Sequence, residues 1–444
     1  MPDTNTHTNK AATVETDNLP PHKSAIRRRS RDKKRLFADW RFRAYGIFGL
    51  SMAGCALLFL LVNIFSTGYS AFRQTTVTMN FNLDAEVLGV ETNSSAEEKL
   101  DANVVAVIKK SLYASFPDVK KRKDKRKLFK LMSLGAELDL RDYIIENPES
   151  IGTNIEMTVP MSSDADQYYK AILRGEEIKS RLNDKQQQWL HALLDAEKIT
   201  TRFNSDFFTN ADSRYPELAG IGGAVIGTFY TLIICLLLAF PLGVGAAIYL
   251  EEFSRDSFIT RIIEANINNL AAVPSVIFGL LGLAVILNMF DLPRSTPLVG
   301  GIVLALMTLP TIIIACRSAI KAVPPSIREG GLAMGASKVQ VVFHHVMPAA
   351  MSGTLTGTII GMAQALGETA PLLMIGMVAF IANAPSTPTD PATAIPVQIY
   401  LWAESAERGF VEKTAAAIMV IIIFLIAMNL LAILVRNRTR VINK

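Results

Sequence analysis

The stretch that decides the fold reads GGAVIGTFYTLIICLLLAFPLGVGAAIY, residues 222–249, and contains no charged side chain. A run of about 20 apolar residues is long enough to cross roughly 30 Å of hydrocarbon as a helix. Pro241, Gly243 and Gly245 interrupt the run. A membrane tolerates such breaks where neighbouring helices or a cavity satisfy the freed backbone groups. The stretch therefore predicts a membrane-spanning helix.

Five further apolar runs predict five further spans. They cover residues 45–65, 270–290, 298–316, 353–380 and 415–435. The first run is too long for a typical signal-peptide core and follows the polar residues 1–43, so we expect a retained helix. The overall hydrophobic content of 50% is also reached by soluble proteins, and only this clustering indicates a membrane protein. The predicted fold class is an all-α polytopic membrane protein with six transmembrane helices.

Residues 67–216 contain no spanning run and predict a soluble α+β domain inserted after the first helix. Val77, Met79 and Phe81 alternate with polar residues, as in a strand with one buried face. Apolar residues between 100 and 112 recur at helical spacing, and a second helix is expected over residues 186–203. We call residues 67–216 the insert.

The distribution of lysine and arginine predicts the topology. With six spans both termini lie on one side, and the short segments assigned to that side hold twenty-one basic residues against three on the other. Basic residues concentrate in cytoplasmic loops. The predicted domains are a basic cytoplasmic tail (1–43), disordered up to about Pro21, then a first helix (44–66), the extracytoplasmic insert, and a core with five more helices (217–444).

Several function classes are disfavoured by the sequence. The basic cluster from Arg27 to Arg35 directly precedes an apolar run, so it predicts a membrane anchor and no nucleic-acid partner. Cys55, Cys235 and Cys316 lie in apolar runs and predict neither a disulfide framework nor a metal site. No G-x-x-x-x-G-K-[ST] loop occurs in the sequence, so the chain is not expected to be an enzyme that hydrolyses ATP.

The predicted cytoplasmic loop 317–350 carries a regular pattern, VPPSIREGGLAMGASKVQVVFHHVMP over residues 323–348. Paired prolines can end one helix and start the next, and Gly335 allows a turn. Residues 338–346 can then form a second short helix that ends at Pro348. The pattern predicts a compact helix–turn–helix on the cytoplasmic surface. An ordinary interhelical loop is the alternative. His344 and His345 point about 100° apart on a helix and are poor joint metal ligands.

This loop resembles the EAA loop of ABC importer permeases, which docks into a cleft on the ATPase. We call residues 317–350 the coupling loop, with residues 325–346 as its docking part. The sequence departs from the family at Gly330 and Gly331, which replace two alanines, and at His345, where isoleucine is common. A glycine costs about 0.5–1 kcal/mol in a helix relative to alanine, which predicts a looser first turn. The resemblance assigns ATPase coupling to Arg328, Glu329, Gly330, Gly331, Gly335, Lys338 and Pro348.

The second informative segment lies in the fifth apolar run and reads GMAQALGETAPLL, residues 361–373. A carboxylate inside a span is costly and indicates function by default. Pro371 weakens the helix next to Glu368, and Gly367 allows another helix to approach closely. The alternative is a structural carboxylate that pairs with a partner helix. The candidate residues for a translocation path are Gln364, Gly367, Glu368, Thr369 and Pro371.

The segment around Glu368 resembles the phosphate importer permeases of ABC transporters, and of their two paired types it resembles the PstA type. Residues 267–282, with an expected helix break at Pro274, support the resemblance. Many family members have an arginine where this chain has Gln364. The resemblance implies an inner-membrane complex with a second, PstC-like permease, a PstB-like ATPase dimer that uses ATP and Mg, a PstS-like extracytoplasmic phosphate-binding protein, and membrane lipid. No cofactor is expected on this chain itself.

The favoured function is therefore a permease that carries phosphate inward by alternating access. A receptor that presents the insert as a sensor, an ATP-independent channel or secondary transporter, and a permease for another oxyanion such as phosphonate or sulfate remain alternatives. The basic run 120–130 in the insert suggests phosphate collection, but a solvated face or contact with anionic lipid is the favoured interpretation.

Overall fold

The computed structural model describes residues 23–175, 181–377 and 380–442. It divides into two units, residues 1–63 and 64–444, which we describe separately. The first unit consists of most of α1 (Lys23–Gly68), whose apolar part includes the predicted span 44–66. The helix is longer than that prediction at both ends. The predicted disordered tail up to Pro21 lies outside the described residues.

The second unit begins with the insert, which contains a three-stranded antiparallel sheet of order β2-β1-β3. Its strands are β1 (Arg73–Asn82), β2 (Asn154–Pro160) and β3 (Ile199–Phe203). Val77 on the central strand pairs with Val159 on one side and with Ile199 on the other. The predicted strand around Val77 is confirmed.

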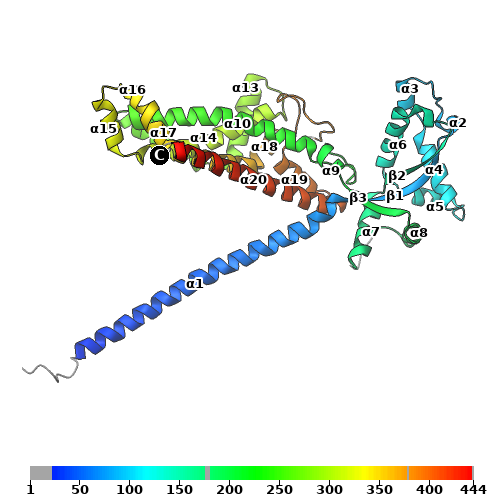
Figure 1. Cartoon of the computed structure of the whole chain (residues 1–444), viewed down its shortest axis with the longest axis horizontal. Helices are drawn as coiled ribbons and strands as arrows, with labels where there is room; N and C mark the ends of the chain where they lie inside the picture. Colours follow the sequence, from blue (N-terminus) through cyan, green and yellow to red (C-terminus); the bar gives the residue numbers. More distant parts are fainter. Residues whose placement is uncertain (1–22, 176–180, 378–379, 443–444) are drawn as a thin grey trace, which may run out of the picture. The chain divides into compact units, whose positions relative to one another are not determined.

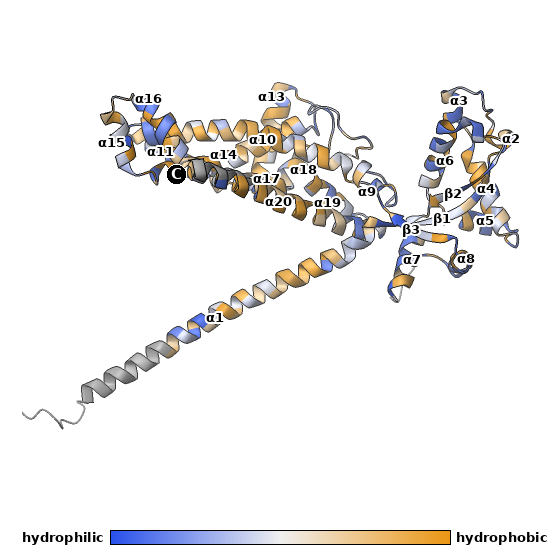
Figure 2. Cartoon of the chain, viewed as in Figure 1, coloured by the Kyte–Doolittle hydropathy of each residue, from blue (hydrophilic) through white to orange (hydrophobic). Residues whose placement is uncertain are grey.

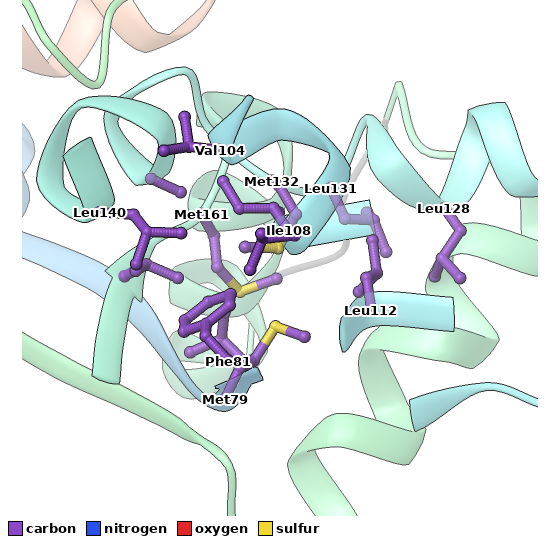
Figure 3. Packing of buried hydrophobic residues seen from close by; sticks show 14 of the residues in the cluster. Met79, Phe81, Val104, Ile108, Leu112, Leu128, Leu131, Met132, Leu140 and Met161 are labelled. Atoms are coloured by element: carbon purple, nitrogen blue, oxygen red, sulfur yellow. The ribbon is translucent and has the colours of Figure 1, made fainter. Parts of the chain in front are cut away.

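Helices cover the sheet and close a core of large side chains. Figure 3 shows Met79 and Phe81 of β1 packed close to Ile108 and Leu140 from the helices. The predicted helix over 186–203 is wrong in its second half, because α8 ends at Asp195 and the chain then enters β3. Residues 199–203 form a strand because they pair with β1. The insert helices are α2 (Ala85–Leu88), α3 (Ala96–Leu100), α4 (Val104–Ser115), α5 (Arg122–Phe129), α6 (Gly135–Glu146), α7 (Ser163–Arg174), α8 (Asp184–Asp195) and α9 (Asp206–Thr209).

The remaining residues of the second unit form the helical core (Figure 1), which is apolar along most of its length (Figure 2). Its long helices are α10 (Gly222–Ile248), α14 (Pro297–Lys321), α17 (Met347–Gly367) and α20 (Gly409–Ile442). Shorter helices connect them: α11 (Phe258–Ala271), α12 (Ser275–Leu281), α13 (Asn288–Phe290), α18 (Ala370–Met374) and α19 (Ile395–Ala403). Within the described residues five helices are long and apolar enough to cross a membrane, or six if one bent pair is counted.

Two predicted spans differ from the structure. The run 270–290 is not one straight helix, because α11 and α12–α13 meet at an angle of 103° across Pro274. The run 353–380 is not continuous either, since α17 ends at Gly367 and only the short α18 follows. In both places proline removes a backbone donor from the helical ladder, and the helix breaks before it.

The helices of the core approach one another at small residues. A Cβ built on Gly301 of α14 would lie 2.6 Å from Ile234 of α10, and one on Gly357 of α17 would collide with the Cβ of Ala315. Such positions let helix backbones come close where no water is available to drive association. The tight packing of α14 between α10 and α17 therefore depends on glycine.

The insert is joined to the first turn of α20 by buried charges. Lys170 Nζ lies 2.5 Å from Asp166 Oδ2 and 3.3 Å from Glu412 Oε2, and its side chain is only 8% exposed. Lys413 Nζ donates to the Ala219 carbonyl at 2.9 Å. Burial raises the pKa of the nearby Glu217 carboxyl above its ordinary value. The Lys170–Glu412 pair links α7 of the insert to α20, and removal of either partner would leave a costly buried charge.

Candidate functional site

The coupling loop folds as a helix–turn–helix at one end of the helical core (Figure 1). α15 (Pro325–Ala333) begins directly after Pro324, which is its N-cap residue. Gly335 has a φ of 87°, a left-handed conformation that glycine adopts without steric cost. Ser337 then caps α16 (Lys338–Val341) in a capping box with Gln340. The predicted proline start and glycine turn are both present.

The second helix of the coupling loop does not end at Pro348, contrary to the prediction. α16 continues through the π-helical turn η5 (Val342–Val346) into α17, and Pro348 lies in the first turn of α17. In a regular α-helix the proline ring collides with the carbonyl four residues earlier. The wider π turn that precedes it relieves this collision. One 30-residue helix therefore runs from Lys338 to Gly367.

The two glycines that replace the family's alanines have different surroundings. Gly331 is buried, and a Cβ there would lie 2.8 Å from Val341 Cγ2 and 3.5 Å from His345 Cδ2. Gly330 is exposed and has no atom within 4 Å of its built Cβ among the described residues. Gly331 thus lets α15 pack directly against α16 and η5. α15 is helical through both positions, so the expected looseness is not visible in its backbone.

Arg328 lies at the base of the coupling loop rather than on its outer surface. Its guanidinium donates to Glu252 Oε1 at 2.8 and 3.0 Å, to the Val323 carbonyl at 2.7 Å and to the Ile320 carbonyl at 2.9 Å. The Glu252 side chain is 8% exposed. These bonds attach α15 to the end of α14 and to η3 (Tyr249–Phe253), the π-helical turn that continues α10. Charge-assisted hydrogen bonds of this kind are the stronger ones in proteins.

A second ionic cluster lies next to Arg328 and was not singled out from the sequence. Arg317 of α14 lies 2.5 Å from Glu251 and 2.5 Å from Glu264 of α11. Lys321 adds a contact of 3.4 Å to Glu251. The available signal was a pair of acidic residues at the end of one apolar run and an arginine at the end of another. Together with Arg328, the cluster ties three helices to the coupling loop.

The outer face of the coupling loop is exposed and mixed in character. Glu329 and Gly330 are exposed. Lys338 is exposed as well, with Nζ 5.4 Å from the centre of the Phe253 ring. Four large apolar side chains also face outward, with exposed fractions between 52% and 76%: Leu332, Met334, Val339 and Phe343. Exposed large apolar side chains that gather on one segment are typical of interaction surfaces.

The backbone leaves the helix at Glu368. α17 ends at Gly367, Glu368 is extended with φ −79° and ψ 120°, and α18 starts at Ala370. Pro371 lies in the first turn of α18 and is buried. The predicted helix weakening at Pro371 is therefore confirmed as a complete break. It frees backbone groups on either side of the carboxylate.

The side chains at this break are accessible. Gln364 is exposed, whereas Glu368 and Thr369 are partly buried. No ion pair to Glu368 occurs within the part of the chain that the structure describes. Gly367 has no neighbour within 4 Å of its built Cβ among the same residues, so within this chain it is not the predicted point of close helix approach. The break presents polar groups outward.

The close approach occurs instead at Gly279 of α12. A Cβ at Gly279 would lie 2.6 Å from Pro371 Cα and 2.9 Å from Met374 Cβ. α12 starts at the predicted break at Pro274, which is confirmed by the 103° bend. Two short helices that each follow a helix break, α12 after Pro274 and α18 after Glu368, thus pack on each other. Irregular backbone at membrane depth is tolerated where it is buried in protein or lines a cavity.

Comparison with protein families gives two matches that divide the chain. Residues 239–441 match the family described as binding-protein-dependent transport system inner membrane component. Residues 29–177 match a domain of unknown function, DUF3333. The first match includes the coupling loop and the break at Glu368. The second covers most of the insert and part of α1.

Curated relatives match about half of this chain. A Probable phosphate transport system permease protein PstA of Methanocaldococcus jannaschii is 34% identical over 209 residues, 46% of this chain and 72% of the relative. PstA of Haemophilus influenzae is 29% identical and matches 51% of this chain and 78% of the relative. PstC of Pasteurella multocida is also 29% identical, over 47% of this chain and 71% of the relative.

Among solved structures, a chain of the inward-facing MetNI methionine ABC transporter covers 49% of this chain and 96% of its own length. It has 16% sequence identity and a TM-score of 0.41, a likeness too low to interpret.

Proposed function

Because the chain belongs to the phosphate permeases of ABC transporters, within the binding-protein-dependent transport system inner membrane component family, we propose that it forms part of the pathway by which inorganic phosphate enters the cytoplasm. The chain is a multi-pass membrane protein. In the proposed importer it pairs with a PstC-like permease and receives phosphate from a PstS-like extracytoplasmic binding protein. A PstB-like ATPase dimer, with ATP and Mg, supplies the energy.

One observation supports this mechanism above the others: a single helix joins the coupling loop to the break at Glu368. When the ATPases close on ATP, a displacement of residues 338–346 is carried along α17, since a helix is stiff along its axis. Gly367, at its far end, directly precedes Glu368. Movement of the coupling loop therefore becomes movement of the polar break.

The ionic clusters support the same proposal. Arg328 binds η3 and the end of α14 to α15, and Arg317 binds α14 to α11. Because the side chains of Arg317, Glu251 and Glu252 are at most 12% exposed, screening of these charges by salt is weak. The coupling loop then moves together with several spans, as rigid-body alternating access requires.

The proposed orientation places both termini in the cytoplasm and the insert outside. The excess of basic residues in the tail, the coupling loop and the C-terminus supports this orientation. The exposed residues of the coupling loop, with Glu329 and the apolar side chains Leu332, Met334 and Phe343, then face the ATPase. An apolar centre with a charged rim is the usual composition of such an interface.

Phosphate uptake with a Glu329→Ala variant tests the coupling step. Loss of one charge-assisted contact is expected to weaken ATPase association about tenfold or more, while membrane insertion is retained. Co-purification of the ATPase and ATP-driven uptake into proteoliposomes are the measurements. Asp256→Ala, which removes another exposed carboxylate before α11, is the matched control and should behave as wild type. Uptake that persists without ATP would instead identify a channel.

Glu368→Gln tests the translocation step. The variant keeps the size and polarity of the side chain but removes a charge at the break, so phosphate uptake should change while the complex assembles normally. Asp291→Asn, at an exposed position outside the break, is the control. If Glu368→Gln abolishes assembly, the carboxylate is a structural partner of another subunit. Competition by sulfate or phosphonate as strong as by phosphate would reassign the cargo.

A further inference from the structure

An open pocket of about 550 Å³ lies between η1 (Tyr69–Phe72) and strand β3 of the insert. Nothing in the transport mechanism uses it. Aromatic and arginine side chains form most of its lining: Tyr69, Phe72, Arg73, Arg202, Phe203 and Phe208. This combination offers both an apolar wall and positive charge.

The aromatic wall is continuous and exposed. The Phe208 ring stacks on Phe72, with centroids 5.7 Å apart, and on Phe203 at 6.0 Å. Phe203 is 64% exposed, Tyr69 57% and Phe208 42%. Leaving this much apolar surface in water costs about 25 cal/mol per Å². A stacked, exposed aromatic surface beside a charged group indicates a site that something partly apolar covers.

The pocket lies at the end of a membrane span. Tyr69 directly follows Gly68, the last residue of α1. A Cβ built on Gly68 would lie 2.9 Å from the backbone of Ala415 and Ala416, in the first turns of α20. Both helices are candidate spans. Tyrosine and other aromatic side chains concentrate at this level, where headgroups meet the hydrocarbon.

The two arginines of the pocket differ in how their charge is compensated. Arg202 donates to Gln74 Oε1 at 3.2 Å and lies near two carboxylates, Asp206 at 3.6 Å and Asp139 at 3.8 Å. The charge of Arg202 is therefore compensated by carboxylates within the insert.

Arg73 is exposed, donates to Tyr69 Oη at 3.2 Å and lies over the Tyr69 ring. No carboxylate pairs with Arg73 in the described part of the chain. Arg73 therefore leaves positive charge at the pocket mouth, in the planar form that binds phosphate oxygens bidentately.

We propose that this pocket binds a glycerophospholipid of the adjacent leaflet, which is the extracytoplasmic leaflet under the orientation given above. The lipid phosphate bonds to Arg73, and the glycerol and upper acyl segments lie against Phe203 and Phe208. The bound lipid covers the aromatic surface and attaches the insert to the membrane surface. The inference adds a lipid site to the permease and does not depend on which anion the pore carries.

The test uses the full chain in nanodiscs that contain a phosphatidylglycerol analogue with a photoreactive group in the upper acyl chain. Illumination, proteolysis and mass spectrometry then locate the labelled peptides. We expect label on residues 69–73 and 199–208. Arg73→Gln should reduce this label about tenfold, as expected for loss of a hydrogen-bonded charge, and Phe203→Ser should also reduce it. Arg122→Gln, which removes an exposed charge at the start of α5, should leave the label unchanged.

Three results would overturn the proposal. One is label that is absent from both peptides in the wild-type chain. The second is an equal loss in Arg122→Gln, which would show attraction by overall charge. The third is displacement of the label by millimolar inorganic phosphate, which would make the pocket a site for the free anion. Size-exclusion profiles identical to wild type establish that the variants fold. The labelling needs no transport, so its failure leaves the phosphate-import proposal untouched.

Discussion

The insert and the helical core use side-chain volume in opposite ways. The insert buries large side chains against one another, among them Phe81, Leu112 and Met161, all less than 2% exposed. The helical core has its closest contacts at glycines, such as Gly301 against Ile234 and Gly357 against Ala315. Many of its large apolar residues are exposed instead.

The difference follows from the two solvents. In water, burial of apolar surface is the main driving force, so the insert gains stability from each large side chain that it encloses. In a lipid bilayer an apolar side chain gains nothing by leaving the hydrocarbon, and helices associate through close packing and hydrogen bonds. The same chain therefore needs bulk in one region and small residues in the other.

The largest effect is expected from Phe81→Ala in the insert. Phe81 is fully buried, so the substitution opens a cavity in the core of the insert. Such substitutions lower the free energy of unfolding by about 3–5 kcal/mol. Thermal unfolding and limited proteolysis of the insert in the purified chain measure the loss.

Phe229→Ala is the matched substitution in the helical core, where the side chain is 53% exposed on α10. We expect a change below about 0.5 kcal/mol, typical of a surface position. Equal destabilisation by the two substitutions would contradict the proposed contrast between the regions.

Gly357→Val is expected to have the next largest effect. A side chain at Gly357 meets Ala315 and forces α17 away from α14. Overpacking of this kind typically costs about 1–3 kcal/mol. The yield of monodisperse protein in detergent and its unfolding temperature should both fall.

Gly245→Val provides the control for that experiment. A Cβ at this position of α10 has no neighbour within 4 Å among the described residues. Its yield should match wild type. A comparable loss from both variants would mean that glycine acts through backbone flexibility and not through close contact.

The smallest effect, confined to the coupling loop, is expected from Gly331→Ala. Although this change restores the family's residue, the new methyl group meets Val341, and we expect a net loss of about 1 kcal/mol in the packing of α15 on α16. ATPase association and stimulated ATP hydrolysis should fall a few-fold.

Two variants sharpen this prediction. Gly330→Ala faces open space and should gain about 0.5–1 kcal/mol of helix stability without loss of coupling. Val341→Ala combined with Gly331→Ala should restore coupling, because it makes room for the added methyl. Failure of the double variant to recover would refute the steric explanation.

The sequence predicted features that depend on local chemistry. The alternation around Val77 predicted β1, the prolines and Gly335 predicted the helix–turn–helix, and Pro274 predicted a break. Predictions that depended on which distant segment packs against a given residue were less successful. Residues 199–203 form a strand only because β1 lies beside them, and Gly367 has no close neighbour where Gly279 has one.

In the candidate site, too, some features could be predicted from local sequence and others depended on distant contacts. Its acidic residue Glu329, its turn at Gly335 and the carboxylate of Glu368 within an apolar run could be selected from residue type and spacing. The inward position of Arg328 depends on Glu252, which lies far away in sequence on another helix. Long-range ion pairs leave no periodic signal and could not be assigned before the helices were placed.

The amino-acid sequence by itself determined where this chain can cross a membrane and where it must turn. These properties follow from the hydropathy, backbone freedom and missing donors of individual residues. Only the tertiary structure decided that Pro348 does not end the coupling loop and that one helix continues to Gly367. The π-helical turn η5 directly precedes Pro348 and lets the helix continue through the proline, and residue type alone did not reveal whether the helix would break or widen there.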